Sequence, residues 1–103
     1  MGWHEVSGAH ALGEDEAMAV VLRERPIALV RSGGKLYALY NVCTHQFALL
    51  SEGYVEDGCI ECPLHQGRFD LATGEPKAPP VSMPIPVYPV KTENGKVYVD
   101  LGD

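Results

Sequence analysis

The sequence predicts an all-β fold built from antiparallel strands. Short apolar runs separated by turn residues recur at both ends of the chain, and no apolar face recurs at helical spacing for three turns. The 103 residues, 46% of them hydrophobic, suffice for one domain with a modest core. One turn of helix over residues 13–17 is the most helical structure that we expect.

The first strands are expected in the N-terminal 40 residues. Apolar runs at 17–22 and 27–31 are separated by the polar and proline-containing segment 23–26. Residues 32–35, Ser-Gly-Gly-Lys, then connect 27–31 to a further run at 36–40. Two adjacent glycines tolerate the positive φ angles of a primed turn, so this connection predicts a β-hairpin.

The C-terminal residues predict a second hairpin. Runs at 87–91 and 96–99 flank Asn94-Gly95, which is the strongest local hairpin signal in the sequence. The preceding segment contains prolines that cannot donate hydrogen bonds in a central strand, namely Pro76, Pro79, Pro80, Pro84, Pro86 and Pro89. We therefore expect an extended covering segment that leads into an edge strand.

Charge and cysteine content restrict the function classes. The formal net charge is −6, which disfavours binding to nucleic acid or to an anionic membrane surface. The longest apolar run, 17–22, is too short to cross a bilayer, and no secretory signal is recognisable. Three cysteines form no even disulfide framework. These features together predict a cytoplasmic protein.

The middle of the chain differs from its flanks. Residues 43–75 carry six acidic residues and one basic residue, a net charge of −5, so nearly all the excess negative charge lies there. We expect a single domain over 1–103, in which a base formed by 1–40 and 76–103 carries an inserted subdomain at about 41–75.

Two Cys-His pairs lie in this middle segment. Cys43 precedes His45 by two positions, Cys62 precedes His65 by three, and sixteen residues separate the pairs. Two thiolates on one iron and two neutral imidazoles on the other would make the second iron of a 2Fe–2S cluster the electron acceptor. A structural zinc site and a Cys-His nucleophile pair are the alternatives. Zinc modules usually pair like ligands with like, whereas each pair here is mixed.

The sequences Cys43-Thr44-His45 and Cys62-Pro63-Leu64-His65 resemble the Rieske 2Fe–2S motif. The chain is most similar in length and character to the small Rieske ferredoxins of bacterial aromatic-ring-hydroxylating dioxygenase systems. This resemblance implies an antiparallel β-sandwich base with an inserted cluster-binding subdomain. It also implies one cluster, with Cys43 and Cys62 on the inner iron and His45 and His65 on the outer iron.

The same resemblance implies an electron carrier that catalyses no reaction of its own. Such a ferredoxin takes single electrons from a flavin-dependent NAD(P)H reductase and delivers them to a terminal oxygenase, and we expect a monomer. A basic patch on either partner would complement the acidic middle segment. The alternatives are a small Rieske subunit of a nitrite reductase and a zinc-stabilised interaction module.

The sequence departs from the respiratory branch of the family at informative positions. Ala48 and Leu64 replace the cysteines that form a disulfide in that branch. Gly67 and Phe69 replace a serine and a tyrosine whose hydroxyls donate to the cluster and cysteine sulfurs. Without these donors the reduced cluster is less stabilised, so we expect a potential near the low end of the Rieske range of roughly −150 to +300 mV.

Other residues are expected to act through packing or through their backbone. Phe47, Leu49 and Leu64 should shield the cluster from water, and the backbone N–H groups after each histidine should face its sulfur atoms. Cys59 is expected to be a buried strand residue that binds no metal.

Overall fold

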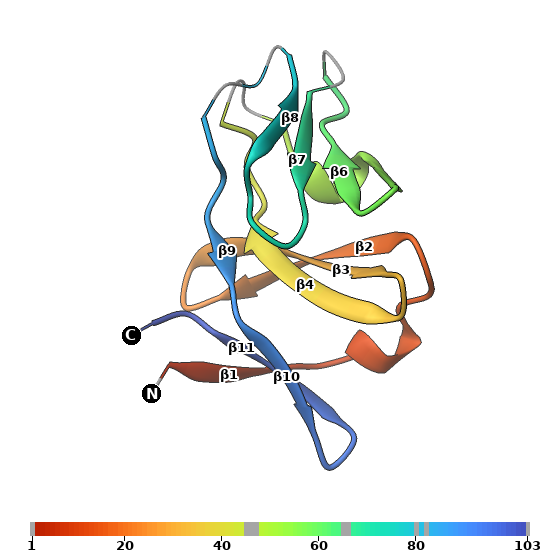
Figure 1. Cartoon of the computed structure of the whole chain (residues 1–103). Coiled ribbons are helices and arrows are strands. Elements are labelled where there is room, and N and C mark those ends of the chain that lie inside the picture. Colours follow the sequence, from red (N-terminus) through yellow and green to blue (C-terminus); the bar gives the residue numbers. More distant parts are fainter. Residues whose placement is uncertain (1, 45–47, 65–66, 80, 82, 103) are drawn as a thin grey trace.

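The computed structural model of the chain describes residues 2–44, 48–64, 67–79, 81 and 83–102. Within them, strands form three antiparallel sheets stacked along the length of the molecule (Figure 1). The predicted all-β, antiparallel fold is confirmed. The two expected hairpins, with turns at Gly33-Gly34 and Asn94-Gly95, are also present, and all four turn residues have positive φ angles.

The bottom sheet in Figure 1 has the order β1 (Trp3–Val6), β11 (Lys96–Asp100), β10 (Val90–Glu93). The central sheet has the order β2 (Glu16–Leu22), β3 (Arg25–Ser32), β4 (Lys35–Tyr40), β9 (Val87–Tyr88). The top sheet has the order β5 (Tyr54–Glu56), β6 (Cys59–Glu61), β7 (Arg68–Asp70), β8 (Pro76–Ala78). Two short 3-10 helices, η1 (Ala9–Ala11) and η2 (Leu50–Glu52), lie between strands.

The N-terminal strands differ from expectation at two places. The β2–β3 turn consists only of Arg23 and Glu24, with φ angles of 51° and 66°, so β3 already begins at Arg25. A two-residue primed turn matches the twist of the two strands, which explains why the connection is shorter than the expected 23–26. The single helical turn that we expected at most over 13–17 does not form, because Glu16 already pairs with Arg31 in the sheet.

Proline 89 divides the expected C-terminal strand into two. β9 pairs with β4 at the edge of the central sheet, whereas β10 pairs with β11 in the bottom sheet. Pro89 has no N–H group to donate, but its carbonyl accepts a hydrogen bond from the Asp100 N–H at 2.9 Å. The chain therefore changes sheets at this residue, and the edge strand expected after the proline-rich segment is β9.

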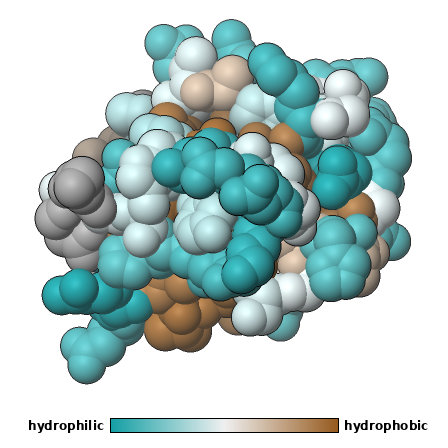
Figure 2. Space-filling model, turned by 90° about the horizontal axis from the view of Figure 1, so that it is seen from below, coloured by the Kyte–Doolittle hydropathy of each residue, from teal (hydrophilic) through white to brown (hydrophobic). Residues whose placement is uncertain are grey.

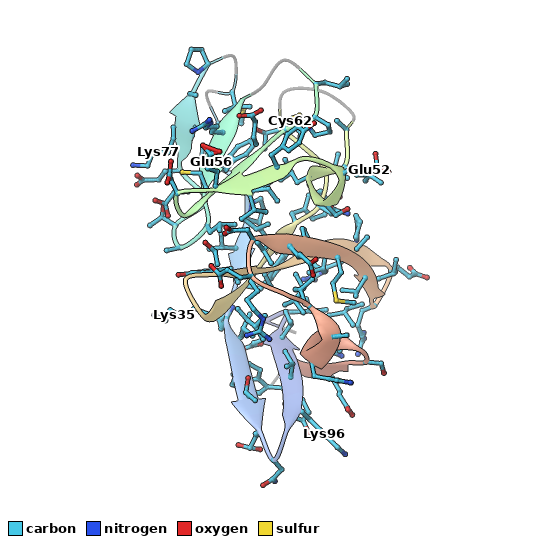
Figure 3. The ribbon with its side chains drawn as sticks, turned by 90° about the vertical axis from the view of Figure 1, so that its right-hand side faces the viewer. Lys35, Glu52, Glu56, Cys62, Lys77 and Lys96 are labelled. Atoms are coloured by element: carbon cyan, nitrogen blue, oxygen red, sulfur yellow. The ribbon has the colours of Figure 1, made fainter. Side chains whose placement is uncertain are left out.

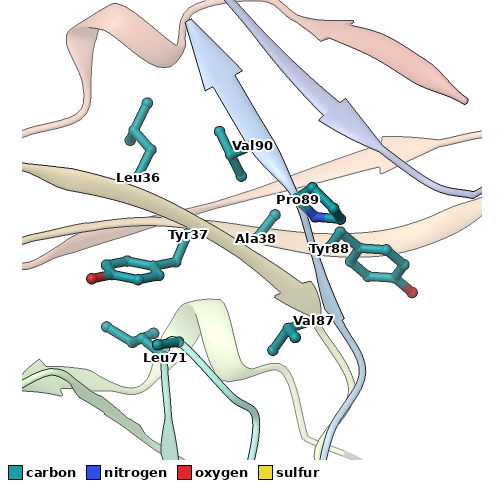
Figure 4. Close-up of a pocket in the computed structure, with 9 residues that line it drawn as sticks. Leu36, Tyr37, Ala38, Leu71, Val87, Tyr88, Pro89 and Val90 are labelled. Carbon is teal, nitrogen blue, oxygen red and sulfur yellow. The ribbon is translucent and has the colours of Figure 1, made fainter. Parts of the chain in front are cut away.

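An open apolar pocket of about 380 Å³ lies at this crossing, between β4, β9 and the turn after β7 (Figure 4). Among the described residues that line it, only Tyr37 and Tyr88 carry a titratable side chain. The pocket therefore offers no pair of acid and base groups for catalysis.

The central sheet has a hydrophobic core on each face. Ala28 and Val30 of β3 face the top sheet, while the alternate residues Ile27 and Leu29 face the bottom sheet. All four are fully buried. The central sheet therefore lies between the two outer sheets and packs against one of them on each face.

The end of the molecule opposite the top sheet presents mainly hydrophilic residues, with smaller hydrophobic areas between them (Figure 2). No helix in the described part of the chain is long and apolar enough to cross a membrane.

Candidate metal centre

The two predicted cysteine ligands each begin a tight loop at the top of the molecule. The Cys43 N–H donates to the Ala48 carbonyl at 2.9 Å, and the Cys62 N–H donates to the Gly67 carbonyl at 2.7 Å. In sequence, His45 lies inside the first loop and His65 inside the second. Both histidines lie outside the described residues, so their predicted role as ligands stays a prediction.

The fold brings the two cysteines together although eighteen residues separate them in sequence. Cys43 is 5% exposed and Cys62 is 1% exposed, and the Cys43 thiol lies close enough to affect the pKa of Cys62. Both belong to the upper hydrophobic core, together with Phe69 and Leu50. Two sulfur donors therefore converge in a site from which water is excluded.

Burial raises the pKa of the Cys62 thiol, because a thiolate loses hydration there. The backbone N–H of Leu64 opposes this shift, whereas the adjacent Cys43 thiol raises the pKa further. Two thiolates this close and this dry repel each other unless a cation neutralises them. The donor set therefore fits a metal that binds two thiolates, as one iron of a Rieske cluster does.

The described residues alone do not complete such a site. Among them, no group of three or more His, Cys, Asp or Glu side chains is placed to hold a metal ion. A four-ligand site would need donors from the segments 45–47 and 65–66, which include both predicted histidines.

The first loop is held at its stem by Asn41, which the sequence analysis did not identify. The Asn41 side chain accepts from the Ser51 N–H at 2.8 Å and donates to the Ser51 hydroxyl at 2.9 Å. Its backbone N–H donates to Pro26 of the base, and its carbonyl accepts from the Leu50 N–H. Asn41 is 2% exposed. Its position two residues before Cys43 is the only feature of the sequence that pointed to it.

The proline-rich segment contacts both loops. The Thr44 hydroxyl donates to the Met83 carbonyl at 3.0 Å. Val81 is buried, and its Cγ1 would lie 2.5 Å from a Cβ atom added at Gly67. A serine at position 67, the residue of the respiratory branch, could therefore be accommodated only if Val81 moved.

Two expectations about neighbouring side chains are wrong. Leu64 is 45% exposed and does not shield the site, although its N–H donates to the Cys62 sulfur. Cys59 lies in β6 as expected but is only half-buried, because it is on the outer face of the top sheet. Leu49 is half-buried, and Phe47 lies outside the described residues.

Comparison with known proteins agrees with this geometry. The Rieske [2Fe-2S] domain family matches residues 2–89. The chain is 48% identical to the anthranilate 1,2-dioxygenase ferredoxin subunit of Burkholderia cepacia, over 97% of this chain and 93% of that protein. It is 43% identical to the ferredoxin component of the naphthalene 1,2-dioxygenase system of Pseudomonas putida, over 96% and 95%.

A solved structure is also similar. It is a complex of reduced oxygenase and oxidised ferredoxin in carbazole 1,9a-dioxygenase, and one of its chains superposes with a TM-score of 0.90 at 36% identity. The match covers 96% of this chain and 93% of that chain.

Proposed function

Because this chain belongs to the Rieske [2Fe-2S] domain family, we propose that Cys43, His45, Cys62 and His65 hold its cluster. The protein carries one Rieske-type 2Fe–2S cluster, and it is a ferredoxin of the kind that serves aromatic dioxygenase systems. It transfers electrons and is not itself the catalytic enzyme. The observation that supports the ligand set best is the convergence of two buried thiols from two loops that each enclose a histidine in sequence.

When bound, the cluster accepts and releases one electron at a time. Cys43 and Cys62 would hold the cluster from the upper core, where burial keeps water away from their sulfur atoms. The Leu64 N–H donates to the Cys62 sulfur and stabilises negative charge on it. Asn41 and Thr44 hold the first loop to the base and to the proline-rich segment.

We infer two redox partners for this carrier. A flavin-dependent NAD(P)H reductase supplies the electrons, and the terminal oxygenase of an aromatic-ring-hydroxylating dioxygenase receives them. The similarity to the ferredoxin that was solved in complex with an oxygenase supports the second partner. We further propose a cytoplasmic monomer, because the described cysteines are all free thiols and a carrier that diffuses between partners needs no second copy.

We also propose the division into a base and a cluster-binding subdomain at about 41–75. The separate upper sheet, which begins at Tyr54, supports this division, and its fourth strand is Pro76–Ala78.

The decisive experiment compares the wild type with two histidine variants. We expect two irons and two acid-labile sulfides per chain, and a rhombic EPR spectrum after reduction with dithionite. His65→Ala should lose this spectrum and most of the iron. His10→Ala, which changes an exposed histidine of the base, should keep both.

Colourless wild-type protein with stoichiometric zinc would overturn the proposal. A second step adds NADH with the reductase and the oxygenase of an anthranilate or naphthalene dioxygenase system. Formation of the dihydroxylated product only in the presence of this ferredoxin would support both partners. A holoprotein that neither component reduces or oxidises would refute them.

A further inference from the structure

The outer face of the top sheet carries a small pocket beside the second ligand loop. The alternate residues Val55, Ile60 and Phe69 face inwards, and the last two are fully buried. The residues between them face outwards and form a pocket of about 120 Å³, lined by Tyr54, Glu56, Cys59, Glu61 and Arg68. β6 runs directly into Cys62 and β7 begins after Gly67, so the pocket floor is continuous with the second loop.

The charges in this pocket do not cancel. Glu61 lies opposite Arg68 in the sheet register and pairs with it, with Oε1 3.1 Å from Nε. Glu56 is exposed, and among the described residues its carboxylate has no hydrogen-bond or ion-pair partner. The charges of Asp57, Asp70 and Lys77 also act on Cys59 of the pocket. Together with the lining residues, four acidic side chains face two basic ones, so the surroundings of the pocket remain negative.

An exposed aromatic ring lies beside the Glu56 carboxylate. Tyr54 of β5 is 70% exposed. It stands on the free edge of the sheet, since β5 pairs only with β6 within the described sheet. An exposed ring next to a free carboxylate is a suitable partner for a cation, because the ring face and the carboxylate attract positive charge together.

The size of the pocket restricts the occupant. Sites for small-molecule ligands usually measure about 300–1,000 Å³, so this pocket is too small for a cofactor or an aromatic substrate. It is large enough for the end of one side chain. The segment 43–75, to which the pocket belongs, has a net charge of −5, and Glu52 and Glu56 lie at the same end of the molecule as Cys62 (Figure 3).

We propose that this pocket receives a protruding arginine or lysine side chain of a redox partner protein, between the Tyr54 ring and the Glu56 carboxylate. This rests on the proposed function as an electron carrier, and it adds a specific lateral contact beside the ligand loops. Charge complementarity supports a protein with a basic surface as the partner. Such a contact would fix the orientation in which the partner docks against the end of the molecule that carries the ligand loops.

The test uses the reduced holoprotein and cytochrome c, a basic haem protein, in stopped-flow electron transfer. Three variants are compared with the wild type: Glu56→Gln, Tyr54→Ala and the control Glu93→Gln. Glu93 is an exposed acid on the β10–β11 hairpin, so its substitution changes net charge equally but far from the pocket. Iron content, EPR spectrum and midpoint potential are measured for each, so that a loss of the cluster is separated from a loss of docking.

At low ionic strength we expect Glu56→Gln to lower the second-order rate constant about two- to fivefold, as for the loss of one exposed ion pair. Tyr54→Ala should lower it by a similar factor and should keep its effect at high salt, because it removes no charge. Glu93→Gln should stay close to the wild type. If Glu56→Gln slows transfer but Tyr54→Ala does not, only general negative charge matters and the pocket is refuted. If all three variants transfer electrons at the same rate as one another, the pocket is also refuted. In either case, unchanged EPR spectra show that the cluster is present, so the proposed function is not affected.

Discussion

The base and the top layer of this molecule use different means to hold their chain in place. In the base, β2 and β3 pair over seven residues and β3 and β4 over six, and the turns between them have two residues. In the top layer every strand has three residues. The second ligand loop connects β6 to β7, and the first lies between β4 and η2. The short strands of the top layer form few hydrogen bonds each, so their stability depends more on the packing of their hydrophobic face.

The top layer compensates by sharing a core with its neighbours. Its hydrophobic cluster includes Ala28, Val30 and Leu39 of the central sheet and both ligand cysteines. The cysteines thus serve as core residues and as metal ligands at once. A change in the top layer is therefore expected to disturb the metal site, while a change in the base outside this shared core is expected to leave the site intact.

Among the variants considered, Gly53→Ala, which adds a single methyl group, is expected to reduce stability most. A Cβ atom at Gly53 would lie 1.8 Å from the Glu61 carbonyl oxygen, which is backbone and cannot rotate away. We expect a loss of about 3 kcal/mol or more in the free energy of unfolding, with hydrogen-exchange protection lost first in β5 and β6. Urea unfolding followed by circular dichroism, together with hydrogen exchange, measures both.

The matched control is Gly34→Ala in the base. Gly34 has a φ of +78°, and a Cβ atom there would meet no atom within 4 Å. Only backbone strain of about 1–2 kcal/mol is expected, and cluster content should not change. If the two alanine variants lose equal stability and equal amounts of iron, the difference between the regions is wrong.

The base was easier to predict from sequence than the top layer. Asn94-Gly95 and Gly33-Gly34 act locally, because the required positive φ angles select these residues regardless of the rest of the fold. The cysteine pair could also be predicted, since two mixed Cys-His loops are a specific pattern. These features depend on residues close together in sequence.

The remainder depends on contacts between distant segments. The hydrogen bonds of Asn41 to Ser51 and to Pro26 form only when three distant segments of the chain come together. No local sequence pattern predicts them. The exposure of Leu64 and the contact of Gly67 with Val81 depend on how the proline-rich segment crosses the loops. A leucine and a glycine are compatible with several such environments, so their sequence positions alone did not decide between them.

Asn41→Ala should have the next largest effect, and it acts on the connection between the regions. It removes the acceptor of the Ser51 N–H, which leaves a half-buried donor unsatisfied at a cost of about 1–3 kcal/mol. The first loop should open more often, so visible absorbance of the cluster should decay several-fold faster with an iron chelator present. Ser51→Ala keeps the Ser51 N–H bond to Asn41 Oδ1 and should accelerate the decay less. If the cluster absorbance of Asn41→Ala decays at the wild-type rate, the hydrogen bonds of Asn41 do not restrain the first loop.

A smaller effect is expected on the midpoint potential. Gly67→Ser must be combined with Val81→Ala, because Val81 Cγ1 occupies the space of the new Cβ atom. The serine hydroxyl would stabilise the reduced cluster by one hydrogen bond of about 1 kcal/mol, which corresponds to a rise of about 40 mV for a one-electron couple. The reference is Val81→Ala alone, measured by redox titration followed with EPR. A potential that is equal or lower in the double variant would mean that residue 67 does not face the cluster sulfurs.

The smallest effect belongs to the base, at Glu14. Its exposed carboxylate accepts hydrogen bonds from the N–H groups of Gly33 and Gly34 at the β3–β4 turn, and the Gly34 bond measures 3.0 Å. These donors favour the ionised form and lower the pKa of Glu14 below its usual value of 4.5. Since the folded pKa lies below the unfolded one, the stabilisation is complete above the unfolded pKa and disappears as the pH falls through the folded pKa.

Glu14→Gln should therefore lower the melting temperature slightly and by the same amount at pH 7 and at pH 6, because wild-type Glu14 is ionised at both. In NMR titrations of the wild type, the Gly33 and Gly34 amide protons should shift with a midpoint below 4.5. Glu93→Gln, which loses only a Lys91 contact at 3.9 Å, should leave these protons unchanged. A midpoint at or above 4.5 would show that the turn does not stabilise the carboxylate. Because this turn lies in the base, the EPR spectrum of the cluster should be identical in Glu14→Gln and the wild type, which is the sharpest contrast with Gly53→Ala.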